Sequence, residues 1–377
     1  MNILEEIQNC PVEWKELGDK NVSKLSRGKV MSKQFLEENK GEFPVYSSQT
    51  ANNGEIGRIS SFEYDGEYIT WTTDGANAGT VFYRRGKFSI TNVCGLVEIN
   101  NDQLLTKFVY YYLTISTKKY VSSGMGNPKL MSNVMGKIKI PIPPLEIQEK
   151  TVQILDKMTE YVTELTSELT SELTSRKKQY SYYRDKLLSF EDEVYQVEWK
   201  TLGEVAENLD NMRKPVAKGG RSLGIYPYYG ASGIVDYVDS FIFDGDYLLI
   251  SEDGANLVVR KTPIAFAISG KTWVNNHAHV LKFDNIINQK FVNYYLNYLD
   301  LSPYITGAAQ PKLNQQNLNN IKIPYPSLEI QYRIVQVLDN FDTVCNDLNI
   351  GLPKEIELRQ KQYEYFREKL LTFVAEG

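Results

Sequence analysis

Two short segments contain residue types that enzymes use, but neither has the spacing that the chemistry requires. Gly270-Lys271-Thr272 matches the end of a phosphate-binding loop, yet Ala265 stands where that loop needs its earlier glycine. Pro143-Pro144 lies between Ile142 and Leu145, without the Asn or Asp and the aromatic residue that flank this pair in amino-methyltransferases. No convincing carboxylate and lysine arrangement for a nuclease is present either. We therefore expect no catalytic residues in this chain.

Basic residues suited to contact DNA cluster in two places. The first cluster is Arg84, Arg85 and Lys87, and its counterpart by region is Arg260, Lys261 and Lys271. Arginine and lysine bind phosphates and pair with guanine, so we expect DNA contact here. A solvated turn between strands is the alternative for each residue.

The segment Ser269–His279, SGKTWVNNHAH, combines a cation, an indole and two carboxamides. Asn275 or Asn276 could pair with adenine as bidentate amides do. We predict a DNA-reading loop that includes Lys271, Trp273 and His277. Alternatively, Trp273 belongs to the core, and His277 or His279 is a buried histidine with its hydrogen bonds satisfied.

Two further loops occur once in each half of the chain. The segments NPKL and QPKL contain Lys129 and Lys312, which are candidates for phosphate contact, unless these loops only shape the junction with the following helix. The sequence DGAN occurs at residues 74–77 and 253–256 and is first of all a turn signal.

The overall composition limits the possible classes of protein. The net charge of −5 is unusual for a nucleic-acid binder; residues 1–143 carry +2 and residues 191–326 carry −3, so DNA contact would come from local basic loops. Three scattered cysteines and two histidines predict neither a disulfide framework nor a metal site. The N-terminus has no signal-peptide pattern and the chain no apolar run of membrane-spanning length. We expect a cytoplasmic protein without membrane contact.

The strongest signal is internal repetition. The segment that contains NPKL and IKIPIPPLEIQ returns as QPKL and IKIPYPSLEIQ, so that Pro128 corresponds to Pro311. RKKQYSYYRDKLLSF from Arg176 returns as RQKQYEYFREKLLTF from Arg359, at the same shift. A repeat that spans about half of the chain indicates duplicated domains and a pseudo-twofold plan, since solenoid repeats are far shorter.

Helical patterns follow each Pro-rich strand end. Apolar residues recur at steps of three and four, which is typical of helices that pack in a coiled coil, and Gly351 and Pro353 predict a break in the second helical region. The residues expected to pack are Leu165, Leu169, Leu173, Tyr180, Tyr183, Leu187, Leu348, Tyr363, Phe366 and Leu370.

The first helical region contains TELTSELTSELTS at Thr163–Ser175, with leucines four residues apart. Four residues extend a helix by about 6 Å, against about 3.4 Å for a base pair. One repeat unit would therefore change the separation of two DNA-reading domains by about one or two base pairs. The alternative is a tolerated surface helix.

Taken together and in this order, these motifs identify a family. With SEDGAN and SGKTWVNNHAHVLKF, the chain resembles type I restriction-modification specificity subunits over essentially its whole length. The resemblance implies two target-recognition domains that read a bipartite DNA sequence, joined by two antiparallel helices. It also implies that the N-terminal ILEEI and the C-terminal KLLTF lie near each other.

The resemblance further implies the partners and their cofactors. Two methyltransferase subunits would bind S-adenosylmethionine and methylate adenine, and motor-nuclease subunits would use ATP and magnesium. This chain itself would bind no cofactor. Because SSQTANNGEIG in the first half differs from GASGIVDYVDS in the second, we expect the two half-sites to differ.

We therefore predict an α+β fold with two mixed, strand-rich domains and two long antiparallel coiled-coil-like helices. The expected domains are 1–143 and 191–326, and the expected helical spacers are 144–190 and 327–377. Two rival hypotheses are a self-contained methyltransferase or nuclease, and a helical adaptor that does not touch DNA.

Overall fold

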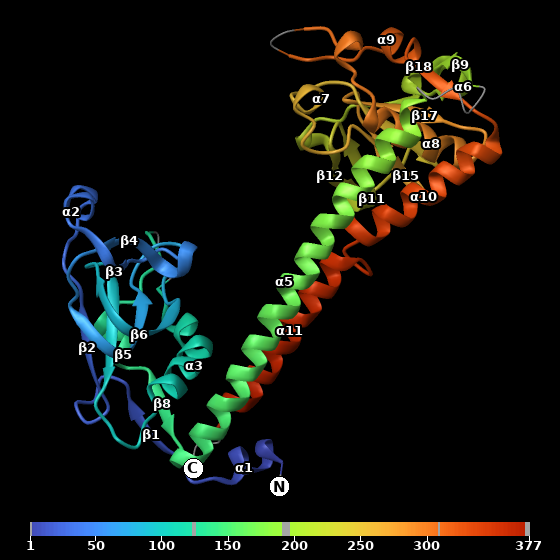
Figure 1. Ribbon diagram of the computed structural model, residues 1–377. Coiled ribbons are helices and arrows are strands. Elements are labelled where there is room, and N and C mark those ends of the chain that lie inside the picture. Colours follow the sequence, from blue (N-terminus) through green and yellow to red (C-terminus); the bar gives the residue numbers. More distant parts are fainter. Residues whose placement is uncertain (1, 123–125, 191–196, 308–309, 374–377) are drawn as a thin grey trace. The chain divides into compact units, whose positions relative to one another are not determined.

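The computed structural model describes residues 2–122, 126–190, 197–307 and 310–373 (Figure 1). The chain divides into two compact units. Unit 1 comprises residues 1–168 and 356–377, and unit 2 comprises residues 169–355. Each unit combines a strand-rich domain with parts of the long helices, which confirms the predicted α+β class.

A six-stranded sheet forms the body of unit 1, in the order β2-β7-β5-β6-β3-β4. Neighbouring strands are antiparallel except β3 and β6, which are parallel. Helix α3 lies against β5 and β6 (Figure 1), and Trp71 and Phe108 belong to the same buried cluster. Gly95 faces Trp71, and a Cβ atom at residue 95 would lie 2.3 Å from the indole, so this close approach requires glycine. The elements are α1 (Ile3–Asn9), β1 (Glu13–Glu16), β2 (Ser23–Arg27), α2 (Lys33–Glu38), β3 (Lys40–Tyr46), β4 (Glu55–Ile59), β5 (Tyr64–Thr72), β6 (Val81–Ile90), β7 (Cys94–Ile99), α3 (Thr106–Ser116), α4 (Ser132–Met135) and β8 (Lys139–Ile142).

Unit 2 repeats this plan with its strands divided between two four-stranded sheets, β10-β17-β14-β15 and β12-β11-β16-β13. Strands β11 and β16 form the parallel pair that corresponds to β3 and β6. Helix α8 packs on β14 and β15, as α3 does on β5 and β6. The elements are β9 (Glu198–Thr201), α6 (Leu202–Val205), β10 (Glu207–Asn208), β11 (Leu223–Gly230), β12 (Gly233–Val238), β13 (Phe243–Asp244), β14 (Tyr247–Ser251), α7 (Asn256–Val259), β15 (Ala265–Ile268), β16 (Lys271–Val274), β17 (Ala278–Lys282), α8 (Ile286–Tyr298), α9 (Gln315–Asn319) and β18 (Lys322–Tyr325).

Three long helices complete the two units. They are α5 (Leu145–Ser189), α10 (Leu328–Asn346) and α11 (Leu352–Leu371). In unit 1, the first part of α5 runs antiparallel to α11, because Leu155 shares a buried cluster with Leu370 and the Thr159 hydroxyl lies 2.9 Å from that of Tyr363. In unit 2, the second part of α5 packs against α10, where the rings of Tyr180 and Phe341 lie 6.1 Å apart. The predicted break is confirmed, since α10 ends before Gly351 and α11 begins after it.

The two units are closed in the same way by a phenylalanine that follows a helix. In unit 1, Phe373 meets Phe108 of α3 at 5.9 Å between ring centroids and 70° between planes. In unit 2, Phe190 meets Phe291 of α8 at 6.1 Å and 74°. The two pairs are counterparts in the sequence repeat. In unit 1, Ile7 of α1 and Leu370 belong to one buried cluster, which confirms that the ILEEI and KLLTF segments lie near each other.

The predicted helix-packing residues fall into three groups. Leu370 is buried, while Leu165, Leu169, Leu173, Tyr180, Leu187 and Tyr363 are half-buried. Tyr183 and Phe366 are 44 % and 40 % exposed, and Tyr183 stacks on Phe341 at 5.7 Å. The prediction for Leu348 is wrong, because this residue lies in the turn between α10 and α11 and is 71 % exposed. Helix α10 already ends at Asn346, so the apolar stripe stops before Leu348.

The Phe373 contact predicts a local loss of stability. Phe373→Ala should destabilise unit 1 by about 3 to 5 kcal/mol, because it removes a buried ring and leaves a cavity. Amide hydrogen exchange followed by mass spectrometry should then be faster in α3 and α11 and unchanged in α8. Tyr365→Ala is the control, since this side chain is 58 % exposed; equal effects of the two substitutions would contradict the prediction.

Candidate nucleic-acid interface

In unit 1, the DGAN loop and the NPKL loop form one junction. The Gly75 amide donates to the Pro128 carbonyl at 3.0 Å, and the Leu130 amide donates to the Thr73 carbonyl at 2.8 Å. Asp74 and Lys129 are bridge partners between these loops, and the Lys129 side chain is exposed. Two loops that are far apart in the sequence thus present one surface.

Unit 2 contains the same junction. The Gly254 amide donates to the Pro311 carbonyl at 3.1 Å, and the Leu313 amide donates to the Glu252 carbonyl at 2.8 Å. Asp253 and Lys312 are bridge partners. Both loops are recognisable in the sequence and recur at almost the same shift, but no local pattern indicates that they pair.

A third loop joins each junction through one backbone hydrogen bond. In unit 1 the Thr73 amide donates to the Val93 carbonyl at 3.2 Å, and in unit 2 the Glu252 amide donates to the His277 carbonyl at 2.9 Å. The exposed side chains of Asn276 and His277 therefore lie on the same junction as Lys312, and His277 Nδ1 lies 2.8 Å from Asp253 Oδ2. We name this arrangement the three-loop junction: residues 73–78, 91–93 and 127–130 in unit 1, and residues 252–256, 275–277 and 311–313 in unit 2.

Unit 1 contains one further candidate that was not predicted from the sequence, Asn92. Asn92 is exposed and occupies the position in its loop that Asn276 occupies in unit 2. Its backbone N–H donates to the Lys29 carbonyl at 3.0 Å, and its side-chain carboxamide is not used in this bond. The segments TNV at 91–93 and NNH at 275–277 are equivalent, but they share only the central Asn. One common residue is too little to establish this equivalence from the sequence, and the backbone contacts are needed to see it.

An equivalent leucine carbonyl anchors each junction to its sheet, but the hydrogen-bond donor differs between the two units. In unit 1 the Trp71 indole N–H donates to the Leu130 carbonyl at 2.9 Å. In unit 2 the buried His279 ring donates from Nε2 to the Leu313 carbonyl at 2.7 Å. The alternative that His279 is a satisfied core residue is therefore confirmed.

Two other predicted residues of the SGKTWVNNHAH segment shape the fold. Asn275 is only 7 % exposed, and its side-chain oxygen accepts the His277 amide at 2.8 Å, so the prediction that Asn275 reads a base is wrong. The Trp273 indole N–H donates to the Lys214 carbonyl at 2.7 Å, and its ring stacks on Tyr228. Trp273 therefore has no free donor for a base.

The prediction that Arg84 contacts DNA is wrong. Its side chain is 3 % exposed, donates to the Thr70 hydroxyl at 3.1 Å and to the Asn53 carbonyl at 2.8 Å, and lies over the Tyr46 ring. Burial lowers the pKa of its guanidinium. Arg84 supports the turn between β3 and β4 from within.

The other members of the two basic clusters differ in exposure. Arg85 and Lys87 are exposed on β6, and Lys261 and Lys271 are also exposed, so their DNA contact stays a prediction. Arg260 instead donates to the Leu299 carbonyl at 2.7 Å and thereby caps the end of α8, and burial lowers its pKa. The prediction of a free phosphate contact by Arg260 is wrong.

Beneath the junction of unit 2 lies a network of buried charges. Asp210, Glu252 and His279 have ligand atoms within 4.8 Å of one another, as a metal site would. However, Arg213 lies 2.6 Å from Glu252 and 3.3 Å from Asp210, and Lys312 lies 3.1 Å from Glu252. These cations already neutralise the carboxylates, so the cluster is better explained as an ion-pair network that supports the junction.

The carboxylates of this network have shifted pKa values. Burial alone would raise the pKa of Asp210, but hydrogen bonds from His279 and the Val280 amide and the charge of Arg213 lower it overall. The pKa of Glu252 is likewise lowered, because Arg213, Lys312 and His279 outweigh the effect of burial. Both groups therefore favour the ionised state in the folded protein.

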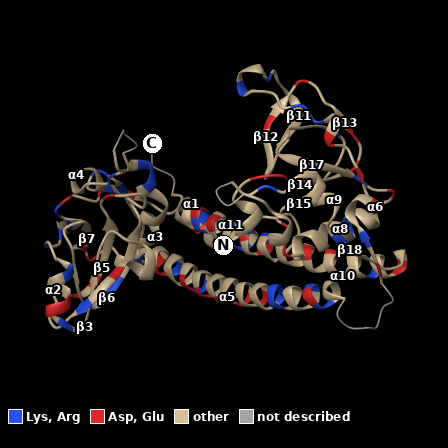
Figure 2. Cartoon of the chain, turned by 90° about the horizontal axis from the view of Figure 1, so that it is seen from above, with Lys and Arg blue, Asp and Glu red and all other residues tan. Residues whose placement is uncertain are grey.

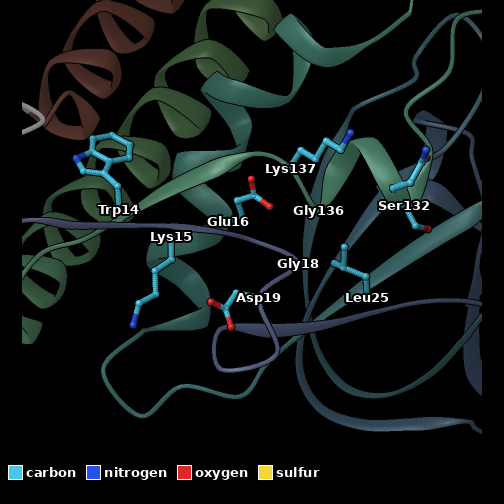
Figure 3. Close-up of a pocket in the computed structure, with 10 residues that line it drawn as sticks. Trp14, Lys15, Glu16, Gly18, Asp19, Leu25, Ser132, Gly136 and Lys137 are labelled. Carbon is cyan, nitrogen blue, oxygen red and sulfur yellow. The ribbon is translucent and has the colours of Figure 1, made fainter.

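One cavity of unit 1 has a lining of mixed charge. In unit 1 a cavity of about 640 Å³ is lined by residues of β1, β2 and α4 and by Lys137. Figure 3 shows that Lys15 and Lys137 extend in opposite directions, so these two cations do not converge on one ligand. The carboxylates of Glu16 and Asp19 add charge of the other sign.

The long helices show neither a strong net charge nor membrane character. Figure 2 shows side chains of both signs of charge along α5; in the sequence, four glutamates at 160–172 precede three basic residues at 176–178. Among the described residues, every helix is too short or too polar to cross a bilayer.

The buried network predicts acid sensitivity of unit 2. A lowered carboxylate pKa stabilises the folded state above the unfolded-state values of about 4, and this stabilisation is lost as the pH falls through the folded-state values. The free energy of unfolding should therefore fall as the pH drops from about 5 to 3, as measured by urea denaturation at each pH. Asp210→Asn should weaken this dependence and cost about 3 kcal/mol at pH 7, because a buried ion pair loses one partner.

Asp284→Asn is the matched control, because Asp284 is exposed. It should leave both the stability at pH 7 and its pH dependence unchanged. The same pH dependence in the Asp210 variant and in the unmodified chain would contradict the assignment.

Comparison with known proteins agrees with the duplicated architecture. Residues 11–175 and 196–358 each match the family model described as type I restriction modification DNA specificity domain. A Mycoplasma pneumoniae protein named type I specificity subunit S.MpnORF507P is 30 % identical over 368 residues, covering 94 % of this chain and 96 % of that protein. A second, S.MpnORF89P, is 34 % identical over 336 residues, covering 85 % and 97 %.

Solved structures show the same fold at low sequence identity. The type I restriction-modification S subunit from M. genitalium superposes with a TM-score of 0.56 at 17 % identity, covering 97 % of this chain and 98 % of that one. A structure from work on complex assembly and conformational transition of the type I R-M system gives a TM-score of 0.59 at 16 % identity, covering 96 % and 98 %. With two matches to the family model that together span most of its length, the chain belongs to the family of type I restriction-modification DNA specificity subunits.

Proposed function

We propose that this specificity subunit binds double-stranded DNA at an asymmetric bipartite target and performs no catalysis itself. The observation that carries the proposal is the three-loop junction, which occurs in both units with the same backbone hydrogen bonds. Its exposed side chains are partly the same, since Asn92 and Lys129 of unit 1 correspond to Asn276 and Lys312 of unit 2, but His277 stands where unit 1 has Val93. A shared frame that differs at such a position is suited to read two half-sites that are not identical.

The chemistry of these side chains suits DNA. Carboxamides pair with adenine in the major groove, and lysines bind phosphates. The negative net charge of the chain would limit binding to unrelated DNA, because nonspecific affinity depends on neutralising phosphates. Exposed Arg85, Lys87, Lys261 and Lys271 would add phosphate contacts.

The proposed partners are two methyltransferase subunits and motor-nuclease subunits. Helices α5 and α11 expose large aromatic side chains, with Tyr161, Tyr182 and Tyr365 at 63 %, 60 % and 58 %, and such residues are frequent at protein interfaces. S-adenosylmethionine would be bound by the methyltransferase, which would take an adenine flipped out of the duplex. ATP and magnesium would be bound by the motor subunit, and the complex would act in the cytoplasm.

Phosphate contact by the junction lysines is testable through salt dependence. Lys129→Gln and Lys312→Gln should each weaken DNA binding by the assembled methyltransferase and reduce the slope of log affinity against log salt by about 0.9. Fluorescence anisotropy with a bipartite duplex at several salt concentrations measures this slope. Lys24→Gln is the control, since Lys24 lies on β2 outside the junction; an unchanged slope in both junction variants would exclude the contact.

The four-residue repeats in α5 predict a helical ruler. Deletion of Thr166 to Leu169 should shorten the gap between the two methylated half-sites by about one or two base pairs, because four residues span about 6 Å of helix. Adenine-methylation mapping in cells that carry the chain and its methyltransferase measures the gap. Glu168→Gln keeps the helix length and should keep the gap. An unchanged methylome after the deletion, with both proteins folded, would reject the ruler and favour an adaptor role.

A further inference from the structure

In unit 1, two residues of α3 hold one carboxylate of α5. Lys107 Nζ lies 2.7 Å from Asp156 Oδ2, and the Tyr111 hydroxyl donates to Asp156 Oδ1 at 2.6 Å. Lys107 and Tyr111 are one helical turn apart, so they face α5 together. Each carboxylate oxygen therefore has its own donor. We name this group of three residues the Lys-Tyr-Asp clamp.

Unit 2 has the same clamp between α8 and α10. Lys290 Nζ lies 2.6 Å from Asp339 Oδ2, and the Tyr294 hydroxyl donates to Asp339 Oδ1 at 2.7 Å. All three residues are the exact counterparts of those in unit 1 in the sequence repeat, and the corresponding distances are nearly equal. The clamp was thus retained in both copies of the duplicated domain.

Positions around the clamp changed while the clamp did not. Thr159 of α5 corresponds to Asp342 of α10, and Tyr110 of α3 corresponds to Asn293 of α8. Burial and the hydrogen bond to Asp raise the pKa of Tyr111, and the same two causes raise that of Tyr294. Both hydroxyls therefore remain donors at neutral pH.

The clamp contributes to the orientation of each domain on its helix more than to the stability of the fold. Its Lys and Asp side chains are between 35 % and 42 % exposed, and ion pairs with this exposure stabilise proteins little. Apolar packing between the helices is non-directional, whereas charge-assisted hydrogen bonds need a defined distance and angle. Two such bonds to one carboxylate fix how far along its axis, and at what rotation, each domain sits on its helix.

A second polar attachment is present in unit 1 and reduced in unit 2. Gln148, eight residues before Asp156, accepts the Leu105 amide at 3.0 Å and donates to the Gln103 carbonyl at 2.7 Å. Its counterpart Gln331 donates to the Pro326 carbonyl, next to its own helix, and its buried side-chain oxygen has no hydrogen-bond partner among the described residues. The orientation of the domain in unit 2 therefore depends more on the clamp.

We infer that the two Lys-Tyr-Asp clamps are positioning elements that set the spacing selectivity of the subunit, each by fixing one recognition domain on its spacer helix. This inference rests on the proposed bipartite reading of DNA. It assigns to Lys107, Tyr111 and Asp156, and to Lys290, Tyr294 and Asp339, a role that involves no DNA contact. The effect of losing a clamp should be larger in unit 2.

The test uses the full chain assembled with its methyltransferase and a duplex library in which the half-sites are fixed and the spacer varies by up to two base pairs. In Asp339→Asn, the preference for the native spacer over spacers one base pair longer or shorter should fall roughly tenfold, which corresponds to about 1.4 kcal/mol. Asp156→Asn should give a smaller fall. A second library with randomised half-sites should show that the base preference at both half-sites is unchanged.

Glu329→Gln is the matched control, because it removes an exposed ion pair with Arg333 within α10 and touches no recognition domain. It should leave the spacer preference intact. If Asp339→Asn prevents folding, Tyr294→Phe carries the test, since it keeps the ion pair and removes one hydrogen bond; a fall of about threefold is expected.

The outcomes separate the inference from the proposal on which it rests. Absence of any bipartite preference in the unmodified complex would refute the proposed function. A bipartite preference whose spacer selectivity survives in both Asp339→Asn and Tyr294→Phe would overturn the clamp inference alone. A lower melting temperature with unchanged spacer selectivity would show that the clamp is only a stabilising contact, and would equally overturn it.

Discussion

Each unit depends on the docking of a helix end that comes from a distant part of the chain. Phe373 closes unit 1 against Phe108, and Phe190 closes unit 2 against Phe291, with nearly the same ring geometry. Unit 1 consequently combines two separate segments, residues 1–168 and 356–377, whereas unit 2 is the single segment 169–355, and α5 contributes residues to both units. Duplication has produced two equivalent domains, while the helices connect them covalently and complete their cores.

The two copies use different chemistry to hold the same loops. A neutral indole anchors the Leu130 carbonyl in unit 1, whereas an imidazole within a network of buried charges anchors the Leu313 carbonyl in unit 2. Lys312 is paired with Glu252 at 3.1 Å, whereas the Lys129 side chain is exposed beside Asp74. The backbone of the junction is thus independent of the side chains beneath it, which leaves the exposed residues free to diverge.

Features that repeat in the sequence could be predicted, whereas the roles of single residues were predicted wrongly where they depend on whether the side chain is buried. The internal repeat, the helical stripes and the break at Gly351 were sufficient for the architecture. Arg84 and Arg260 were misassigned because a basic cluster does not indicate which side chain points inward. Asn275 was misassigned because a buried turn and an exposed reading loop use the same residue type. The parallel pairing of β3 with β6 joins distant segments, and no local pattern indicates it.

In the continuous helix α5, any change in length is coupled to a rotation about the helix axis. The helix runs for 45 residues from Leu145 to Ser189, and four residues make slightly more than one turn, so adding a four-residue unit advances a helix by about 6 Å and rotates it by only about 40°. A single added residue would rotate it by about 100° and turn its apolar stripe away from the packed helix. Among units of one to six residues, a unit of four therefore best preserves the packed face of the helix. The repeat size in Thr163–Ser175 suits the angular period of the helix as well as its rise.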